Sequence, residues 1–544
     1  MEWSLSLQAK TRIQLLIIFL PVILLKLIFL ISYPLNLSGD GHNYYAGMLL
    51  PGRALLVHAG GYPFLWGMFL HNFRDLVDVN PILFELIYVA SQQFFDLVCL
   101  VMLYKVVFRY FGWGVGVVSL YFSGLSVFYL SFASMTLPEW LQADLWLLFM
   151  ISLVMGVQRD EHSRNLFFIL SVMLLELAYL VKFNSLILIM LYLPVFLIEK
   201  SRGRIFSLIK NLLIGMGAAI AIHLIYLYGY HYPTTGTYDL HYDAGRVLIV
   251  RVNSLVSPEN GINTKRLFAL NGGLPEKYTH ETYYPYLYRH IEAVPTLDRE
   301  SYRKLYQEIL SKQEFQLDKY IANHPPWKEH QKYSYVLRVQ YYVGLKEGDD
   351  LGSRVAYEAI VSHPNAYIKS ILTAFFRIRP DDWRPRYLPS ITDLDKNAQL
   401  VGMGESGTRY YAVPYYSWHQ VFRTDQPVSW FWKPGLDFLN TISFSTAWPT
   451  LGILFFGTGF SLYELLIKRN IRLDVLVFST LLVFVILFDL ASNVILIFRA
   501  KELRAVYPLI GVCVGLSSKF AFEAGARAWT RIHTRNNYTP QGNY

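Results

Sequence analysis

Charged residues are scarce in this sequence: Asp, Glu, Lys and Arg make up 16% of its 544 residues, whereas 53% are hydrophobic and 16% aromatic. A soluble domain of ordinary composition carries about 25% charged residues. The composition therefore excludes an ordinary soluble protein and indicates a chain that is embedded in a membrane.

Cysteine and internal repeats are also lacking. Cys99 and Cys513 are the only cysteines, and both fall within apolar stretches, so disulfides do not hold the outer part together. Neither a GxSxG pattern nor a plausible exposed cysteine is present, which leaves Ser-His-Asp and cysteine chemistry without support. No segment repeats another, although many secondary transporters are built from repeats.

Long apolar runs are what the sequence has instead. Runs that can cross about 30 Å of hydrocarbon as a helix recur along the chain. They predict a mainly α fold, a polytopic membrane helix bundle with about ten crossings. The expected crossings are 13–33, 82–108, 112–133, 137–157, 165–181, 183–199, 208–229, 440–467, 473–497 and 504–522.

The formal charge of +9 needs no nucleic-acid partner. Lys and Arg concentrate in alternate segments between the crossings, such as 200–210 and 468–472, and this is the positive-inside bias of membrane proteins. It predicts that both termini are cytoplasmic and that Asp40 lies outside. The first apolar segment has no small-residue cleavage site after it, so we expect an uncleaved anchor.

Residues 230–439 are rich in Tyr, Pro, Asn and charged residues and are numerous enough to form an extracytoplasmic domain. Its expected helices are 297–324 and 352–378, and the second has an apolar face suited to the membrane surface. The expected parts of the chain are an N-terminal transmembrane region 1–229 with a first outer loop 34–81, the domain 230–439, C-terminal transmembrane helices 440–523 and a cytoplasmic tail 524–544.

A lone carboxylate, Asp40, stands in the stretch SGDGHNYY directly after the first crossing. One interpretation is that it caps an interfacial helix formed by the segment that follows. The other is that it acts as a general base toward an acceptor hydroxyl outside the bilayer. The stretch alone does not decide between them.

A second outer carboxylate, Glu139, lies in SMTLPEWLQADL. Pro138 can start the fourth crossing, which would put Glu139 in the first helical turn, where the helix dipole alone favours a carboxylate. Glu139 is therefore either a structural residue or a catalytic partner of Asp40. Asp144 lies about one turn deeper and is expected to face the bundle interior, because a charge facing lipid is costly.

Six outer cations depart from the positive-inside bias, and two of them, Arg53 and Arg74, lie in the first outer loop. Lys182 lies in YLVKFNSL, between the fifth and sixth crossings, and Arg499, Lys501 and Arg504 lie in IFRAKELRAVYP, before the last one. Single cations of this kind often extend toward lipid headgroups. As a group they can hold a phosphate, since Arg offers bidentate geometry and Lys a point charge.

Three histidines of the first outer segment, His42, His58 and His71, follow no recognised metal-ligand spacing. We therefore expect no cofactor, with a divalent metal left as an open alternative.

Several soft patterns occur in a characteristic order: SGDGHNYYAGMLL, TLPEWLQADLWLLFM, LLELAYLVKFNSLILIMLYLPVFL, AIVSHPNAYIKSILTAF and ELRAVYPLIGVCVGL. In this order they resemble the GT-C superfamily of integral membrane glycosyltransferases, and they are similar to its protein mannosyltransferase and aminoarabinose transferase group. The patterns cover most of the membrane portion and little of residues 230–350.

The resemblance implies a catalytic carboxylate at Asp40 and a sugar donor linked to polyprenyl phosphate. It makes Lys182, Arg499 and Arg504 candidate ligands of the donor phosphate. Many members of the superfamily have adjacent acidic residues at this point of the first outer loop, whereas Gly41 follows Asp40 here. Whether Asp40 acts alone or with Glu139 therefore stays open.

The leading hypothesis is an inverting glycosyltransferase that moves a sugar from a polyprenyl-phosphate donor to a glycan, lipid or protein acceptor outside the membrane. Its expected catalytic residues are Asp40 and Glu139. The expected substrate-binding residues are His42, Tyr44, Tyr62, Lys182, Arg499, Lys501 and Arg504.

Two other classes of function remain. Intramembrane charges such as Lys26, Asp96 and Glu176 are typical of a transporter or lipid flippase. A tyrosine-rich outer domain also suits a non-catalytic subunit of a polysaccharide assembly system.

Overall fold

The structure, a computed structural model, is helical throughout the part of the chain that it describes. This part comprises residues 7–32, 61–73, 81–126, 138–158, 161–235, 244–273, 343–376, 447–468, 472–495 and 499–536, with a few isolated positions between them. No strand occurs in these ranges. The mainly α fold class expected from the sequence is confirmed.

Eight helices in these ranges are long and apolar enough to cross a membrane. They are formed by α5 (Pro81–Phe111), α8 (Pro138–Gln158), α9 (Glu161–Val181), η3 (Phe183–Leu191) with α10 (Tyr192–Ser201), α11 (Ile205–Tyr226) with η4 (Leu227–His231) and α12 (Tyr232–Thr235), α24 (Ala447–Leu462) with η9 (Tyr463–Ile467), α25 (Leu473–Ile495), and α26 (Arg499–Asn536). Each coincides with a crossing expected from the sequence.

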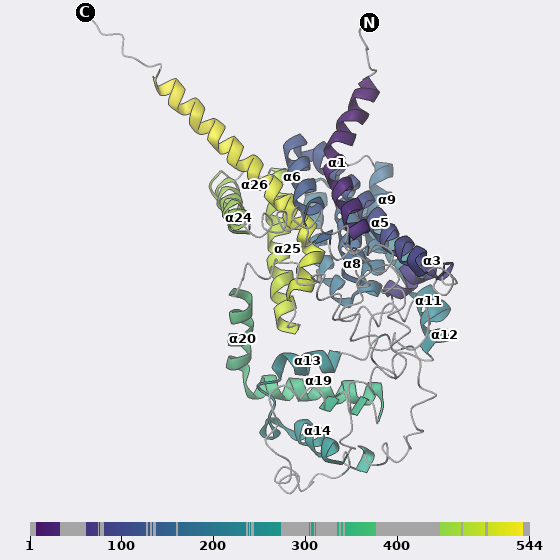
Figure 1. The fold of residues 1–544 in the computed structure, drawn as a ribbon. Helices are drawn as coiled ribbons and strands as arrows, with labels where there is room; N and C mark the ends of the chain where they lie inside the picture. Colours follow the sequence, from purple (N-terminus) through teal and green to yellow (C-terminus); the bar gives the residue numbers. More distant parts are fainter. Residues whose placement is uncertain are drawn as a thin grey trace, which may run out of the picture.

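The other two expected crossings correspond to shorter apolar helices. In α1 (Leu7–Ser32) the apolar part is Gln14–Leu30. The regular part of α6 (Trp113–Gly124) has 12 residues, fewer than the roughly 20 needed to span the hydrocarbon. Together with the eight longer helices they form the membrane bundle seen in Figure 1.

Two helices, α8 and α26, form the centre of this bundle. In each, 78% of the most apolar window is buried inside the protein, compared with 22% in α11. Close helix contacts are made at small residues, as is common in membranes, where association depends on packing rather than on a hydrophobic driving force. A side chain at Gly156 of α8, for example, would lie 2.8 Å from the ring of Phe168 on α9.

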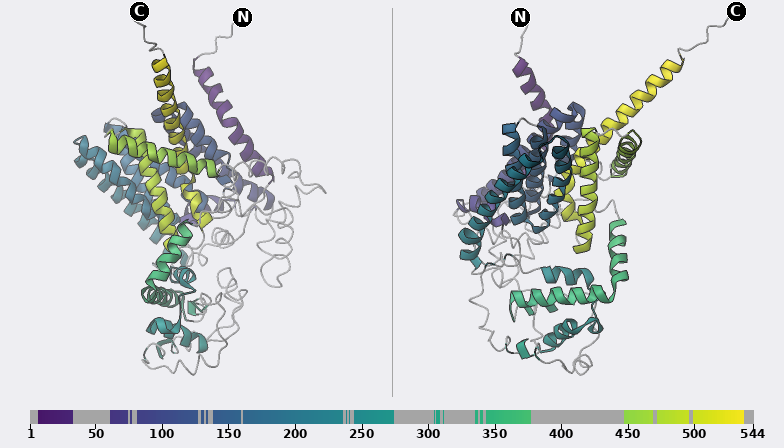
Figure 2. Two further views of the ribbon diagram at one scale, coloured as in Figure 1. Left: turned by 90° about the vertical axis from the view of Figure 1, so that its left-hand side faces the viewer. Right: turned by 180° about the vertical axis from the view of Figure 1, so that it is seen from behind.

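A separate helical unit lies beyond one end of the bundle, and the start of α1 and the end of α26 extend from the other end (Figures 1 and 2). This unit has a core of its own, in which Ile249, Leu267 and Val355 are fully buried. We call it the helical domain. It is made of α13 (Ala244–Val252), η5 (Pro258–Asn260), α14 (Ile262–Gly273), α19 (Leu345–Ser362) and α20 (Pro364–Phe376).

The helix expected at 352–378 is two helices, so that expectation was wrong in detail. His363 ends α19 with φ −133° and ψ 53°, and Pro364 begins α20. Proline has no N–H to donate and disfavours the helical conformation of the residue before it, which explains the break. The chain turns here, and α20 then contacts the membrane helix α25 (Figure 1).

The boundaries at 229 and 523 fall inside continuous helices. Helical structure continues from α11 through Thr235, and α26 runs without interruption to Asn536. The helix expected at 297–324 lies almost wholly outside the described residues.

Candidate functional site

The candidate site lies where α8 begins, at the end of the bundle that faces the helical domain. Pro138 is the first residue of α8 and Glu139 lies in its first turn, as the sequence predicts. Glu139 is only 4% exposed. The helix dipole favours a carboxylate at this position, but a buried charge also needs a specific partner.

That partner is Lys182, which lies between α9 and η3. Its backbone is extended, with φ −158° and ψ 120°, so the chain changes direction here. Lys182 Nζ donates to Glu139 Oε1 at 3.1 Å, and 21% of the lysine side chain remains exposed. The sequence predicts both residues as site residues, and the structure brings them together.

Two further residues of α8 attach it to the same turn. Gln142 Nε2 donates to Asn184 Oδ1 at 2.6 Å and to Ser185 Oγ at 3.2 Å. Trp146 Nε1 donates to Ser185 Oγ at 2.9 Å. Sequence reasoning missed these groups, although Gln142 and Trp146 follow Glu139 at the i+3 and i+7 spacing that places residues on one helix face.

Tyr62 lies in a buried hydrogen-bonded cluster on another side of α8. Its hydroxyl is 2.6 Å from the Tyr88 hydroxyl and 2.8 Å from the Gln92 side-chain amide, and it accepts from Trp140 Nε1 at 3.1 Å. Burial raises the pKa of the Tyr62 phenol above its ordinary value, which keeps the group neutral. Tyr62 is 0% exposed, so its structural role is to join its own segment to α5 and α8.

Gly61 places this segment directly against the Lys182 turn. A Cβ atom at Gly61 would overlap the backbone of Leu180 and Val181 at the end of α9. Glycine is therefore required for the close approach. Residues 61–73, the described part of the first outer segment, are thus held against the turn that carries Lys182.

Asp144 faces the bundle interior, as predicted. It is fully buried and accepts a hydrogen bond from the Tyr129 hydroxyl at 3.2 Å. The Tyr129 ring stacks on Tyr507 of α26, with 6.1 Å between ring centroids. Asp144 thus links α8 to the beginning of α26.

The first turns of α26 contain Arg499, Lys501 and Arg504. Their backbone is described, but their side chains lie outside the described part. Ala505 and Val506, which follow directly, are buried in the same core as Trp140 and Trp146 of α8. The structure therefore brings the helix that carries these cations to the end of the bundle where Glu139 and Lys182 lie.

Three predicted site residues, Asp40, His42 and Tyr44, lie outside the described residues. Their roles stay predictions. Within the part of the chain that the structure describes, no group of three or more His, Cys, Asp or Glu residues could hold a metal ion.

Comparisons with known proteins assign no family to this chain. No family model matches the chain, and no curated protein matches it. Two solved structures of ArnT from Cupriavidus metallidurans are similar at 11% sequence identity. One, bound to undecaprenyl phosphate, has a TM-score of 0.30 over 97% of this chain and 81% of that chain. The other, in the apo state, has a TM-score of 0.31 over 94% and 78%. Similarity at this level carries no residue-by-residue correspondence.

Proposed function

We propose that this chain is a membrane glycosyltransferase that moves a sugar from a polyprenyl-phosphate donor to an acceptor on the side of the helical domain. The observation that supports this most is the Glu139–Lys182 pair. It places a carboxylate and a partly exposed ammonium together at the end of the bundle where a lipid phosphate and a polar acceptor can meet.

In the proposed reaction the acceptor oxygen attacks the anomeric carbon of the sugar. The bond between that carbon and the phosphate oxygen of the lipid breaks, and the polyprenyl phosphate leaves with the electron pair. The acceptor proton passes to a carboxylate, for which Asp40 is the candidate. Negative charge grows on the departing phosphate, so cations fixed in advance contribute most there.

Lys182 is the described residue best suited to that phosphate. An ammonium carries three donors, and the one directed at Glu139 sets the position of the side chain. The hydrogen bonds of Gln142 to Asn184 and Ser185 keep the turn in place against α8. In this proposal Glu139 positions Lys182, and Arg499 and Arg504 complete the phosphate site.

A transporter is the second candidate, because charges lie within the bundle. Lys26 of α1 pairs with Asp96 of α5 and donates to Gln93 Oε1 at 2.9 Å. His223 of α11 lies 2.8 Å from Glu176 of α9. These side chains join neighbouring helices, so the contacts stabilise the bundle and are not specific to a transporter.

Every such transfer releases polyprenyl phosphate, so the experiment measures this product. The purified protein in proteoliposomes is incubated with a panel of sugars on polyprenyl phosphate and with an extract of cell-envelope acceptors, and released polyprenyl phosphate is measured by mass spectrometry. We expect release that is lost in Asp40→Asn. Movement of the lipid between leaflets without release would support the transporter instead. Release that appears only when another glycosyltransferase is added would support a non-catalytic subunit.

A further inference from the structure

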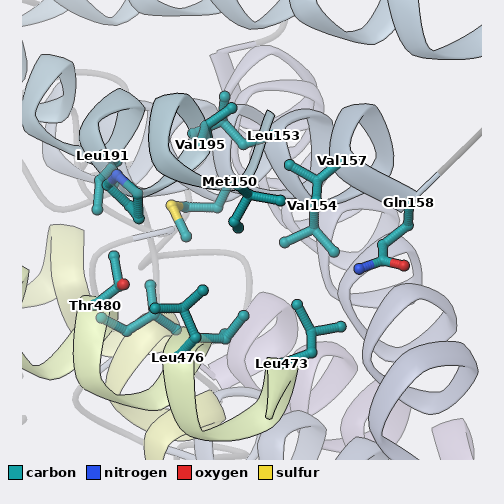
Figure 3. Close-up of a pocket in the computed structure, with 14 residues that line it drawn as sticks. Met150, Leu153, Val154, Val157, Gln158, Leu191, Val195, Leu473, Leu476 and Thr480 are labelled. Atoms are coloured by element: carbon teal, nitrogen blue, oxygen red, sulfur yellow. The ribbon is translucent and has the colours of Figure 1, made fainter. Parts of the chain in front are cut away.

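An apolar groove lies on the half of the bundle that is remote from the helical domain. It is formed between α8, α10 and α25, and its lining includes Leu153 and Val157 of α8 and Leu476 of α25 (Figure 3). Among the described residues that line it, Gln158 and Thr480 have the polar side chains. The groove encloses about 60 Å³, so a chain lying in it keeps one side against the surrounding bilayer.

The groove runs along the helices. Figure 3 shows Leu473 and Gln158 near one end and Thr480 and Leu191 near the other. At a rise of about 1.5 Å per residue, the lining from Leu473 to Leu481 spans about 12 Å. One leaflet of the hydrocarbon core is about 15 Å thick. The groove therefore matches the depth of a single lipid leaflet, the one on the side of the termini.

Partly exposed cations lie on the helix end next to Gln158, where α10 leads into α11. Glu199 of α10 is 1% exposed and pairs with Arg204 at 3.1 Å and with Arg202 at 3.6 Å, and those two side chains are 32% and 39% exposed. A buried carboxylate thus holds two cations toward the outside. This group, one carboxylate with two cations, presents net positive charge at the membrane boundary.

The same pattern recurs nearby. Glu464, also 1% exposed, pairs with Lys468 and Arg527, which are 40% and 46% exposed. Asp474, next to the lining residue Leu473, pairs with Arg472 and Lys519. Glu523, 25% exposed, pairs with Arg472, Lys519 and Arg527 as well, so this cluster combines four cations with three carboxylates and keeps a smaller net positive charge.

Arg202 connects this charge to the groove itself. Its Nη1 donates to the carbonyl oxygen of Val157 at 2.6 Å, and Val157 is a lining residue next to Gln158. A guanidinium and a side-chain amide therefore stand at the end of an apolar groove of one-leaflet depth. Guanidinium groups bind phosphate through paired hydrogen bonds.

We propose that this groove binds one acyl chain of an anionic phospholipid, whose phosphate lies at Arg202 and Gln158. The site is at the opposite end of the bundle from Glu139 and Lys182, and it does not depend on the proposed transferase activity. Its ligand is a lipid of the leaflet on the side of the termini, held by charge at the head and by apolar contact along the tail.

The experiment is native mass spectrometry of the full chain, delipidated in detergent and titrated with phosphatidylglycerol or with phosphatidylcholine of the same acyl chains. Val154→Trp and Leu476→Trp fill the groove. We expect a single phosphatidylglycerol adduct in the wild type that both variants lose. Leu213→Trp places the same ring on the outward face of α11, where Leu213 is 61% exposed, and is expected to keep the adduct.

The head of the site is tested separately. Arg202→Gln should weaken phosphatidylglycerol binding about tenfold, the scale of one charge-assisted hydrogen bond, whereas Lys210→Gln on α11 should not. Each variant is checked by its gel-filtration profile and unfolding temperature. Equal binding of the two lipids by the wild type would overturn the proposal, as would an undiminished adduct in folded Val154→Trp and Leu476→Trp.

Discussion

At the scale of single residues, Glu139 and Lys182 are the residues whose substitution tests the candidate site most directly. Glu139 comes from α8 and Lys182 from the turn between α9 and η3, and their side chains are 5% and 21% exposed. A carboxylate in such a place is tolerated because the ammonium compensates for lost hydration. Each residue therefore contributes to the stability of the fold and is also a candidate for a role in the reaction. The two roles can be separated experimentally.

Lys182→Met should destabilise the protein by about 1–3 kcal/mol, because it leaves the Glu139 carboxylate buried without its ammonium. The loss should be smaller than for a fully buried pair, since Lys182 is partly exposed to solvent. Unfolding of the detergent-solubilised protein measures it, with Lys210→Met as the control. Adding Glu139→Gln to Lys182→Met should recover part of the stability. Fully additive losses in the double variant would contradict the pairing.

Gly61→Ala should displace the Lys182 turn, although Gly61 itself has no side chain in the candidate site. The added methyl overlaps the backbone at Leu180, so the segment or the Lys182 turn must move, at a cost of about 1–3 kcal/mol. Gly114→Ala is the matched control, because a Cβ there meets nothing within 4 Å. Unfolding temperatures of the two variants make the comparison. Equal effects of the two substitutions would show that Gly61 is not needed for close approach.

Much of the site at this scale follows from local patterns. Proline before a glutamate predicts the start of α8, and the cost of a charge in lipid predicts that Asp144 faces inward. The contact of Glu139 with Lys182 is not local, because 43 positions separate them. It depends on how α9 packs on α8, which the order of residues along either helix does not reveal.

At the scale of elements, a side chain of α19 forms the N-terminal cap of α14. Glu358 accepts hydrogen bonds from the backbone N–H groups of Asn263 and Thr264 at 3.0 and 2.8 Å, and from both of their side chains. Burial by itself would raise the pKa of Glu358, but these hydrogen bonds outweigh it and hold the pKa below its ordinary value. The ionised carboxylate therefore joins two helices of the domain.

This cap predicts a pH dependence. Because the pKa of Glu358 is lower in the folded than in the unfolded chain, its contribution is complete above the unfolded value, about 4.3, and is lost as the pH falls through the folded value. Glu358→Gln should cost about 2 kcal/mol at pH 7. The difference from wild type, followed by thermal unfolding, should narrow as the pH falls below about 4. A difference that stays constant over this range would contradict the cap.

Proline also shows where element-level reasoning was incomplete. The stretch from 352 to 378 has helical periodicity throughout, and the structure breaks it at His363. The Pro364 signal was present in the sequence, but the apolar periodicity on both sides concealed it. The break lets α19 stay within the domain while α20 turns toward α25.

At the scale of the whole molecule, the first and last described helices, α1 and α26, extend from one end of the bundle and the helical domain lies beyond the other (Figure 2). The positive-inside bias predicts that the termini are cytoplasmic. The exposed cations paired with Glu199 and Glu464 lie at the same end as the termini. The apolar runs and the charge bias together predict most of the bundle, whereas the arrangement of the outer domain depends on contacts that no run reveals.

Sidedness can be measured with introduced cysteines, because Cys99 and Cys513 are buried. Ser362→Cys in the helical domain should react with a membrane-impermeant maleimide added to intact cells. Ala528→Cys near the end of α26 should react only after the membrane is opened. The reverse pattern would place the domain in the cytoplasm.

The most direct measurement for the central claim is mass spectrometry of lipids, polysaccharides and protein glycans from three matched cell lines. One line has the wild-type chain, one has Asp40→Asn at the same level in the membrane, and one lacks the chain. We predict one envelope component that carries an additional sugar in wild-type cells and lacks it in the other two. An envelope that is the same in all three lines would contradict a glycosyltransferase.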